Sequence, residues 1–239
     1  MTGMLIATLV FFAAFVQSLS GFGFAVLIMP LVTLMLGLRT AAPLVAAIAL
    51  TVYAINVLRF RHAINRGEVL RLAAASALGI PVGIWILSSL DEGLVQQVLG
   101  LMLITFALYN LVRPAGQRVL SRYWVYPSGF LAGCLGGAYN TPGPPAIVYG
   151  TLRRWSRDEF RAALQTLFLI NATLVVASHF LARHMTVQIL DLYLYALPAL
   201  GLGIFLASRV DRKVNRYHFR ILVNIMVLLL GGALLLRVG

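Results

Sequence analysis

The sequence predicts an all-α integral membrane protein built from two inverted repeats, and three observations lead to this fold class. The chain is 61% hydrophobic and 11% charged, whereas a soluble domain is about half apolar and a quarter charged. Its apolar residues form about eight hydrophobic segments, most of them near the roughly 20 residues that cross a bilayer once. Two of these segments, at corresponding places in two halves, are interrupted by glycine or proline. We expect one membrane domain, no soluble domain and no cleavable signal peptide, because no polar stretch is long and no basic region precedes the first apolar run.

The first repeat is expected over residues 1–120. Its first segment, 4–36, would reach about 50 Å as a straight helix, which is longer than the roughly 30 Å of the hydrocarbon core. The break Gln17-Ser18-Leu19-Ser20-Gly21-Phe22-Gly23 interrupts this segment. We therefore expect a re-entrant hairpin of two short helices. Three transmembrane helices follow, over 41–58, 72–90 and 94–112.

The second repeat is expected over residues 121–239 and has the same order of elements. Its long segment, 124–152, is interrupted by Gly136-Gly137-Ala138-Tyr139-Asn140-Thr141-Pro142-Gly143-Pro144-Pro145. Transmembrane helices are expected over 162–181, 189–208 and 219–236. Gly23 and Gly143 are 120 residues apart, and the same offset relates Gly83 to Gly203, Ile84 to Ile204, Leu70 to Leu190, Ser88 to Ser208 and Asp91 to Asp211. Three crossings per half place the second repeat upside down relative to the first.

The distribution of basic residues favours hairpins over single crossings. If both long segments are hairpins, only Arg39, Arg183 and Arg237 lie on one side, and the other 16 of the 19 Lys and Arg residues lie on the opposite side. If both segments cross once, the basic residues divide almost evenly. Because cytoplasmic loops carry the excess of Lys and Arg, we predict six crossings plus two hairpins, with basic loops in the cytoplasm and both termini outside. This topology accounts for the net charge of +12 without a nucleic-acid partner.

The two breaks are candidate substrate-binding sites. Paired interruptions in the two halves of a transporter mark the place where substrate binds, near the midplane where the repeats meet. The second helix of each hairpin is expected to begin near Phe24 and near Pro144, and the start of a helix presents free N–H groups that suit an anion. The candidate residues at the breaks are Gln17, Ser18, Ser20, Gly21, Phe22, Gly23, Tyr139, Asn140, Thr141 and Gly143. Behind them Asn56, Gln165 and Asn171 lie within apolar segments, where interhelical packing is the alternative role.

Other chemistry is sparse in this sequence. Cys134 is the only cysteine, so we expect no disulfide, no cysteine-based metal site and no cofactor, and the chain offers no constellation typical of an enzyme. The spacing Gly79-x-x-x-Gly83 predicts close helix packing. The acidic residues lie in loops or at segment ends, which leaves His179 as the plausible internal proton-coupling group and Asp191 as a weaker candidate.

At its two breaks the chain resembles the TauE/SafE, or sulfite exporter, family of bacterial membrane transporters. The resemblance covers nearly the whole chain and depends on Ser20-Gly21-Phe22-Gly23-Phe24, on the following Pro30, and on the second break at 136–145. It implies movement of sulfite, of sulfonates such as sulfoacetate or of related anions, often outward across the cytoplasmic (inner) membrane. The second break is richer in proline than the glycine-rich repeat typical of the family.

We therefore predict a secondary transporter, an exporter of a small sulfur-containing anion. An inside-negative membrane potential favours anion exit by about 2.3 kcal/mol per charge per 100 mV, so export needs no further coupling. A proton-coupled importer of an organic anion and an anion channel of the same architecture are the alternatives. The expected partners are the anionic substrate and the lipid bilayer, and both a monomer and a homodimer are compatible with the sequence.

Overall fold

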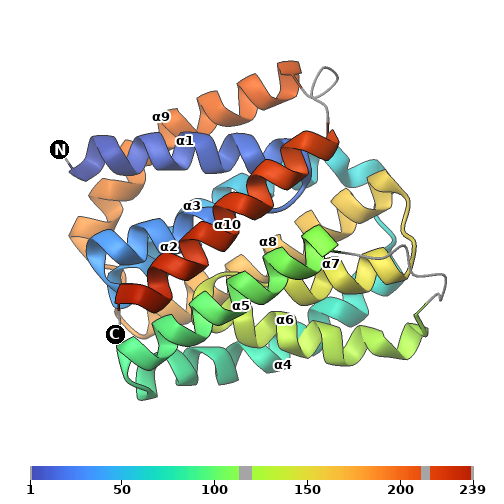
Figure 1. Ribbon diagram of the computed structural model, residues 1–239, viewed down its shortest axis with the longest axis horizontal. Helices are drawn as coiled ribbons and strands as arrows, with labels where there is room; N and C mark the ends of the chain where they lie inside the picture. The colour runs from blue at the N-terminus through green and yellow to red at the C-terminus, as the bar shows by residue number, and fades with distance from the viewer. Residues whose placement is uncertain (1, 113–119, 211–215, 238–239) are drawn as a thin grey trace. The chain divides into compact units, whose positions relative to one another are not determined.

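The computed structural model of the chain describes residues 2–112, 120–210 and 216–237, and across them all regular structure is helical (Figure 1). The helices are α1 (Thr2–Ser20), α2 (Phe24–Leu36), α3 (Leu38–Phe60), α4 (Arg66–Ser89), α5 (Glu92–Val112), α6 (Val125–Tyr139), α7 (Gly143–Leu152), α8 (Arg157–Leu181), α9 (Val187–Val210) and α10 (Arg216–Arg237). Two short 3₁₀ turns, η1 (Arg61–Ala63) and η2 (Arg122–Trp124), precede α4 and α6.

Both long apolar segments are broken where the sequence predicted. Helix α1 ends at Ser20 and α2 begins at Phe24, while α6 ends at Tyr139 and α7 begins at Gly143. Within each pair the two helices pack against each other as a hairpin (Figure 1). Helix α1 is longer than the short helix expected there: its 19 residues extend about 28 Å at 1.5 Å per residue.

Five helices in the described part of the chain are long and apolar enough to cross a membrane: α1, α3, α4, α8 and α9. Shorter apolar stretches lie in α2, α5 and α10. The chain is therefore a multi-pass membrane protein. Within a helix the backbone polar groups satisfy one another, as the interior of a bilayer requires.

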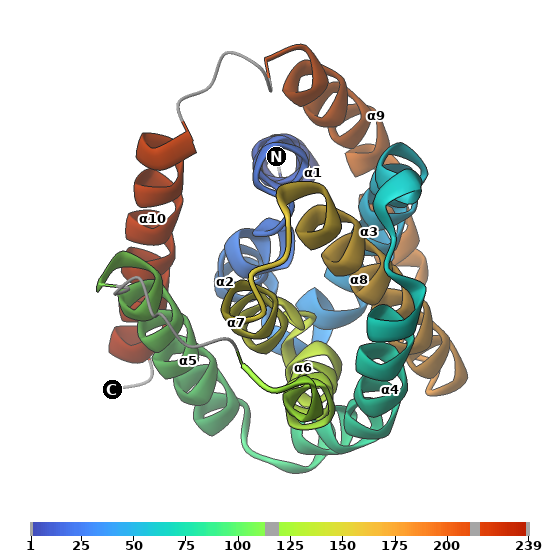
Figure 2. The same cartoon turned by 90° about the vertical axis from the view of Figure 1, so that its right-hand side faces the viewer.

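The chain forms two compact units, and each contains helices from both halves of the sequence. Unit 1 comprises residues 1–45, 89–114 and 185–239. In it α1 packs along α9, α5 packs along α10, and α2 lies against α1 and α10 (Figure 2). At the contact of α1 with α9, a Cβ added to Gly203 would lie 3.3 Å from the Ala14 side chain and closer still to the Phe11 carbonyl oxygen.

Unit 2 comprises residues 46–88 and 115–184, and so contains most of α3 together with α4, α6, α7 and α8. Helix α6 packs against both α7 and α8, and α7 also packs against α8. Ala46, Ile80 and Val175, from α3, α4 and α8, form a buried apolar cluster. These contacts fix the surroundings of the second break.

Helices α4 and α6 run parallel and touch backbone to backbone through small residues. A Cβ added to Gly133 would overlap the carbonyl oxygen of Ser76, and one added to Gly83 would overlap the carbonyl oxygen of Cys134. Gly79 meets α6 in the same way. The sequence prediction that Gly79-x-x-x-Gly83 brings two helices close is confirmed, and the partner is a second small-residue series on α6: Gly129, Gly133 and Gly137.

Candidate functional site

The first break, in unit 1, is a short turn that depends on glycine. Gly21 and Gly23 have φ angles of 85° and 109°, values that residues with a Cβ rarely adopt. The N–H of Gly21 donates to the carbonyl of Gln17 at 2.8 Å, and the N–H of Leu27 donates to the carbonyl of Gly23 at 3.0 Å. The turn thus ends α1 and starts α2 within three residues.

Gln17 is buried and its amide is bonded to the backbone of the break. Its Oε1 accepts the Phe24 N–H at 2.9 Å, which satisfies one of the unpaired donors at the start of α2. Its Nε2 donates to the Gly21 carbonyl at 3.4 Å. In this conformation Gln17 therefore caps α2.

Ser20 also serves the turn. Its Oγ donates to the Val16 carbonyl at 2.8 Å and accepts the Phe22 N–H at 3.2 Å. The Phe22 ring packs edge-on against Phe106 of α5, with centroids 6.4 Å apart, and Ser18 is buried. The N–H groups that follow Phe24 in the first turn of α2 have no partner within the helix, and a ligand could accept hydrogen bonds from them.

The second break, in unit 2, ends α6 with a left-handed residue. Asn140 has φ 55°, its N–H donates to Gly136 at 2.9 Å, and the N–H of Thr141 donates to Leu135 at 3.2 Å. This pair of bonds is the usual way to satisfy the last carbonyls of a helix. Asparagine tolerates the left-handed conformation better than other non-glycine residues.

Helix α7 starts with fewer amide donors than the sequence interpretation assumed. Proline has no N–H, so Pro144 and Pro145 present none in the first turn, and the preceding Pro142 presents none either. The Gly143 N–H is the donor that remains at the start of the helix. An anion at this end of α7 would need side-chain donors as well.

Thr141 is the side chain at the second break whose hydrogen-bonding capacity is open. The residue is 1% exposed, and its Oγ1 has no hydrogen-bond partner among the described residues. A buried hydroxyl without a partner costs about 1–3 kcal/mol. A bound ligand or an ordered water would satisfy such a group, and the position of Thr141 at the break is what makes a ligand the candidate.

A small cavity of about 10 Å³ lies beside this break within unit 2, which is room for roughly one water. Its walls come from α3, from α8, from the end of α6 and from the break itself. The ring centroids of Tyr53 and Phe168, both on the wall, are 5.2 Å apart. No charged residue lines the cavity, whose residues are Ala49, Tyr53, Gly136, Asn140, Pro142, Phe168, Asn171, Ala172 and Val175.

Asn171 is fixed in this wall by two hydrogen bonds. Its Oδ1 accepts the Ser76 hydroxyl at 2.9 Å, and its Nδ2 donates to the Leu167 carbonyl at 3.1 Å. Gly136 lies against it, since a Cβ there would be 2.7 Å from Asn171 Oδ1. The structure brings Asn140 and Asn171 to one cavity. Tyr139, Asn56 and Gln165 are buried but are not among the residues of its wall.

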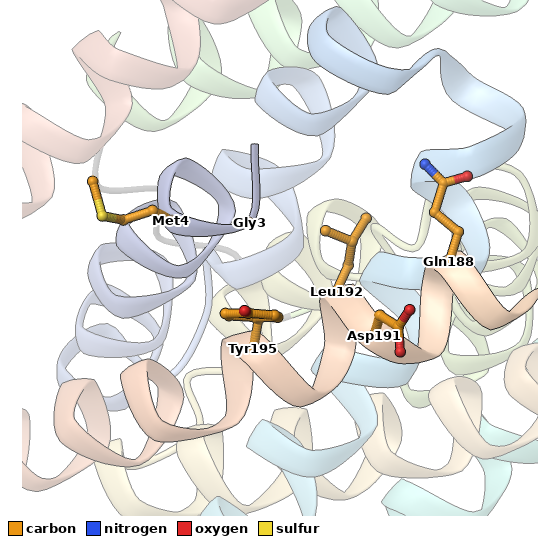
Figure 3. Close-up of a pocket in the computed structure, with 6 residues that line it drawn as sticks. All are labelled: Gly3, Met4, Gln188, Asp191, Leu192 and Tyr195. Atoms are coloured by element: carbon orange, nitrogen blue, oxygen red, sulfur yellow. The ribbon is translucent and has the colours of Figure 1, made fainter. Parts of the chain in front are cut away.

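The two candidate proton-coupling residues lie in different surroundings. His179 is 1% exposed, with its Nδ1 3.1 Å from Nδ1 of His184. Asp191 is exposed on the first turns of α9. It lines an open surface hollow of about 590 Å³ together with Gly3, Met4, Gln188, Leu192 and Tyr195 (Figure 3).

Sequence reasoning missed Tyr53, Phe168 and Ser76 as neighbours of the second break. One signal was available: Tyr53 precedes Asn56 by one helical turn and Phe168 precedes Asn171 by one turn, so each pair lies on one helix face. The link from Ser76 to Asn171 spans 95 positions, and nothing local indicated it.

Glu68 forms a second polar cluster in unit 2. Its carboxylate accepts hydrogen bonds from Tyr149 Oη at 2.6 Å, Trp155 Nε1 at 2.9 Å and Arg153 Nε at 3.0 Å. The Glu68 side chain is 12% exposed. The cluster joins the start of α4 to the end of α7 and the residues that follow it.

A multi-pass helical membrane protein with two glycine- and proline-broken helix pairs has the features of a secondary transporter. The family model described as "Sulfite exporter TauE/SafE" matches residues 6–234. The chain belongs to this family, and the resemblance inferred from the sequence is confirmed. Searches of curated proteins and of solved structures found no match.

Proposed function

We propose that this protein is a secondary transporter that exports a small sulfur-containing anion, such as sulfite or a sulfonate like sulfoacetate, and that the second break contributes to the binding site. Family membership supports the transporter class and the sulfur anion. The placement of the binding site at the second break is supported by Thr141, whose buried hydroxyl has no hydrogen-bond partner among the described residues. Its neighbours Asn140 and Pro142 both line the cavity.

The proposed recognition uses uncharged donors. The Thr141 hydroxyl, the Gly143 N–H and the Asn140 side chain would hydrogen-bond the oxyanion, and each donor to a charged ligand contributes about 1.5–3 kcal/mol. Without a cationic side chain in the wall, binding stays weak enough for release. The cavity of about 10 Å³ must widen to admit sulfite, which is what alternating access requires of a carrier.

The proposed architecture is two inverted repeats, and equivalent helix contacts support the duplication. Gly83 of α4 lies against Cys134 of α6, and Gly203 of α9, 120 residues later, lies against Phe11 and Ala14 of α1. Ala14 is the counterpart of Cys134 at the same offset. The fourth helix of each half thus packs on the first helix of the other half. The contributions of the first break, of Asn56, of Gln165 and of Tyr139 to binding remain predictions from the sequence.

The proposed setting is a cytoplasmic membrane with the basic loops inside and both termini outside. Anion exit down an inside-negative potential gains about 2.3 kcal/mol per charge per 100 mV. Export is therefore driven without a coupling ion.

A proton-coupled importer is the second candidate, and His179 favours it. This residue is buried, contacts His184, and has an Nε2 with no partner among the described residues. Buried ionisable groups in membrane segments commonly serve proton relays. If this candidate holds, flux requires a proton gradient and His179→Gln abolishes the dependence.

The test is electrogenic transport in proteoliposomes under a set voltage and with no pH gradient. Sulfite, sulfoacetate, sulfate and acetate are compared, with taurine, a zwitterion without net charge, as the control and empty liposomes as the blank. A saturable current with sulfite or a sulfonate supports the proposal. Flux that appears only with a proton gradient supports the importer, and a conductance that does not saturate indicates a channel. Silence with every sulfur anion contradicts the proposed substrate.

A further inference from the structure

A second hollow in unit 2, separate from the break, combines basic and aromatic side chains. It measures about 180 Å³ and is lined by Arg71, Arg122, Tyr123, Val125 and Tyr126. Arg71 lies in the second turn of α4, and the other four residues come from η2 and the start of α6. The tight glycine contacts between α4 and α6 hold the two sides of the hollow together.

The two arginines are available to an anionic ligand. Arg71 and Arg122 are both exposed, and neither forms an ion pair with an acidic residue in the part of the chain that the structure describes. The Arg122 guanidinium stacks over the Tyr123 ring, 5.5 Å from its centroid, which orients it. Two guanidinium groups at one hollow supply positive charge and the paired N–H donors through which arginine binds a phosphate.

The hollow continues into an apolar surface. On α4, Leu78 and Trp85 follow Arg71 at successive seven-residue steps, on one helix face, and are 72% and 62% exposed. On α6, Phe130 follows Tyr126 by four residues and is 40% exposed. In a multi-pass membrane protein an exposed apolar face of this kind meets acyl chains.

We propose that this hollow binds the phosphate head group of an acidic phospholipid, with the acyl chains along α4 and α6. Basic pockets between membrane helices bind such head groups. Exposed tyrosine and tryptophan side chains mark the membrane–water boundary. Tyr123 and Tyr126 of the hollow and the neighbouring Trp124 are 65%, 53% and 54% exposed. A lipid fits this surface better than free phosphate does, because its phosphate would lie in the hollow at the membrane–water boundary while its acyl chains cover the apolar face of α4 and α6.

The experiment uses the full chain, purified in detergent and stripped of lipid. Native mass spectrometry measures binding of phosphatidylglycerol against phosphatidylcholine with the same acyl chains, and inorganic phosphate is the soluble competitor. Each basic side chain near a membrane surface contributes about fivefold, so two contribute about 30-fold. We expect phosphatidylglycerol to bind about 30-fold more tightly than phosphatidylcholine. R71Q/R122Q should reduce this preference to less than threefold, whereas the control R61Q/R66Q, which removes the same charge outside the hollow, should keep it.

Equal losses in both double variants would overturn the proposal, and so would displacement of phosphatidylglycerol by millimolar inorganic phosphate. Unfolding temperatures in phosphatidylcholine check that both variants fold. A photoactivatable phosphatidylglycerol tests the wild-type protein directly and should label peptides that contain Arg71 or residues 122–126. Labelling confined to other peptides would also refute the site.

Discussion

Replacing Thr141 with valine tests whether its hydroxyl binds the ligand. A hydroxyl that bonds only to the ligand predicts a more stable protein that transports less well, whereas a hydroxyl with a structural role predicts a less stable protein. Valine has nearly the shape of threonine but lacks the hydroxyl. In the structure this hydroxyl is buried and has no partner among the described residues. The substitution therefore removes no protein hydrogen bond that the structure shows.

The expected change in stability is a gain. An unpartnered buried hydroxyl costs about 1–3 kcal/mol, so Thr141→Val should raise the free energy of unfolding by about 1 kcal/mol after some relaxation around the hydroxyl. For a chain of this size that corresponds to a melting temperature about 2–4 °C higher. The measurement is thermal unfolding of the substrate-free protein in detergent.

The expected change in transport is a loss. If the hydroxyl donates to the bound anion, its removal costs about 1.5–3 kcal/mol, which is about 10- to 150-fold in substrate affinity. Initial rates of sulfite or sulfoacetate flux in proteoliposomes, measured over a range of concentrations, report this as a raised half-saturation concentration.

Thr33 provides a matched control within the same chain. It is also 1% exposed, and its Oγ1 likewise has no partner among the described residues. It lies nine residues into α2, or about 13 Å along the helix from the first break. Thr33→Val should gain similar stability and transport normally. Normal transport by Thr141→Val, or an equal loss in both variants, would refute the reasoning.

Three further substitutions test the supports of unit 2, each by thermal unfolding in detergent. Gly133→Ala should lower the free energy of unfolding by about 3 kcal/mol or more, because the new methyl group overlaps the backbone of α4. The control Gly201→Ala, where a Cβ has nothing within 4 Å, should leave stability unchanged or raise it. Equal stability of the two variants would contradict the tight packing of α4 on α6. Glu68→Gln should cost about 1–3 kcal/mol because three donors lose a charged acceptor, and a cost no larger than that of exposed Asp158→Asn would contradict this. Ser156→Ala should cost about 1 kcal/mol by removing the capping box of α8, and an unchanged melting temperature would show that the cap contributes nothing.

The helix breaks were predictable from the sequence because their causes are local. Gly21 and Gly23 adopt positive φ angles that residues with a Cβ rarely adopt, and the consecutive Pro144 and Pro145 suit the first turn of a helix, where a missing N–H breaks no hydrogen bond within the helix. An apolar segment too long for one crossing added an independent signal. Hence the starts of α2 and α7 were located to within a residue of Phe24 and Pro144.

The surroundings of the second break were less predictable because they depend on packing between distant segments. Tyr53 and Phe168 meet across more than 100 residues of sequence, and the bond from Ser76 to Asn171 depends on how α4 and α8 are placed. Local patterns gave the helix face of each residue but not its partner. The role of Gln17 as a helix cap could not be predicted either, since the sequence does not say whether a buried side-chain amide bonds to a ligand or to the start of a helix.

The prolines of the second break bear on how an anion would be held there. A helix start with all its amides forms a site of backbone donors that resists mutation, because every residue supplies an N–H. Helix α7 lacks the donors at Pro144 and Pro145, so recognition at this break shifts to Thr141, Asn140 and the Gly143 amide. Side-chain donors are sensitive to substitution, and selectivity among oxyanions should therefore be altered by single changes at Thr141 or Asn140. The backbone donors at the start of α2 should be kept when the buried Val26 is replaced by a side chain of similar volume, since the N–H does not depend on the side chain.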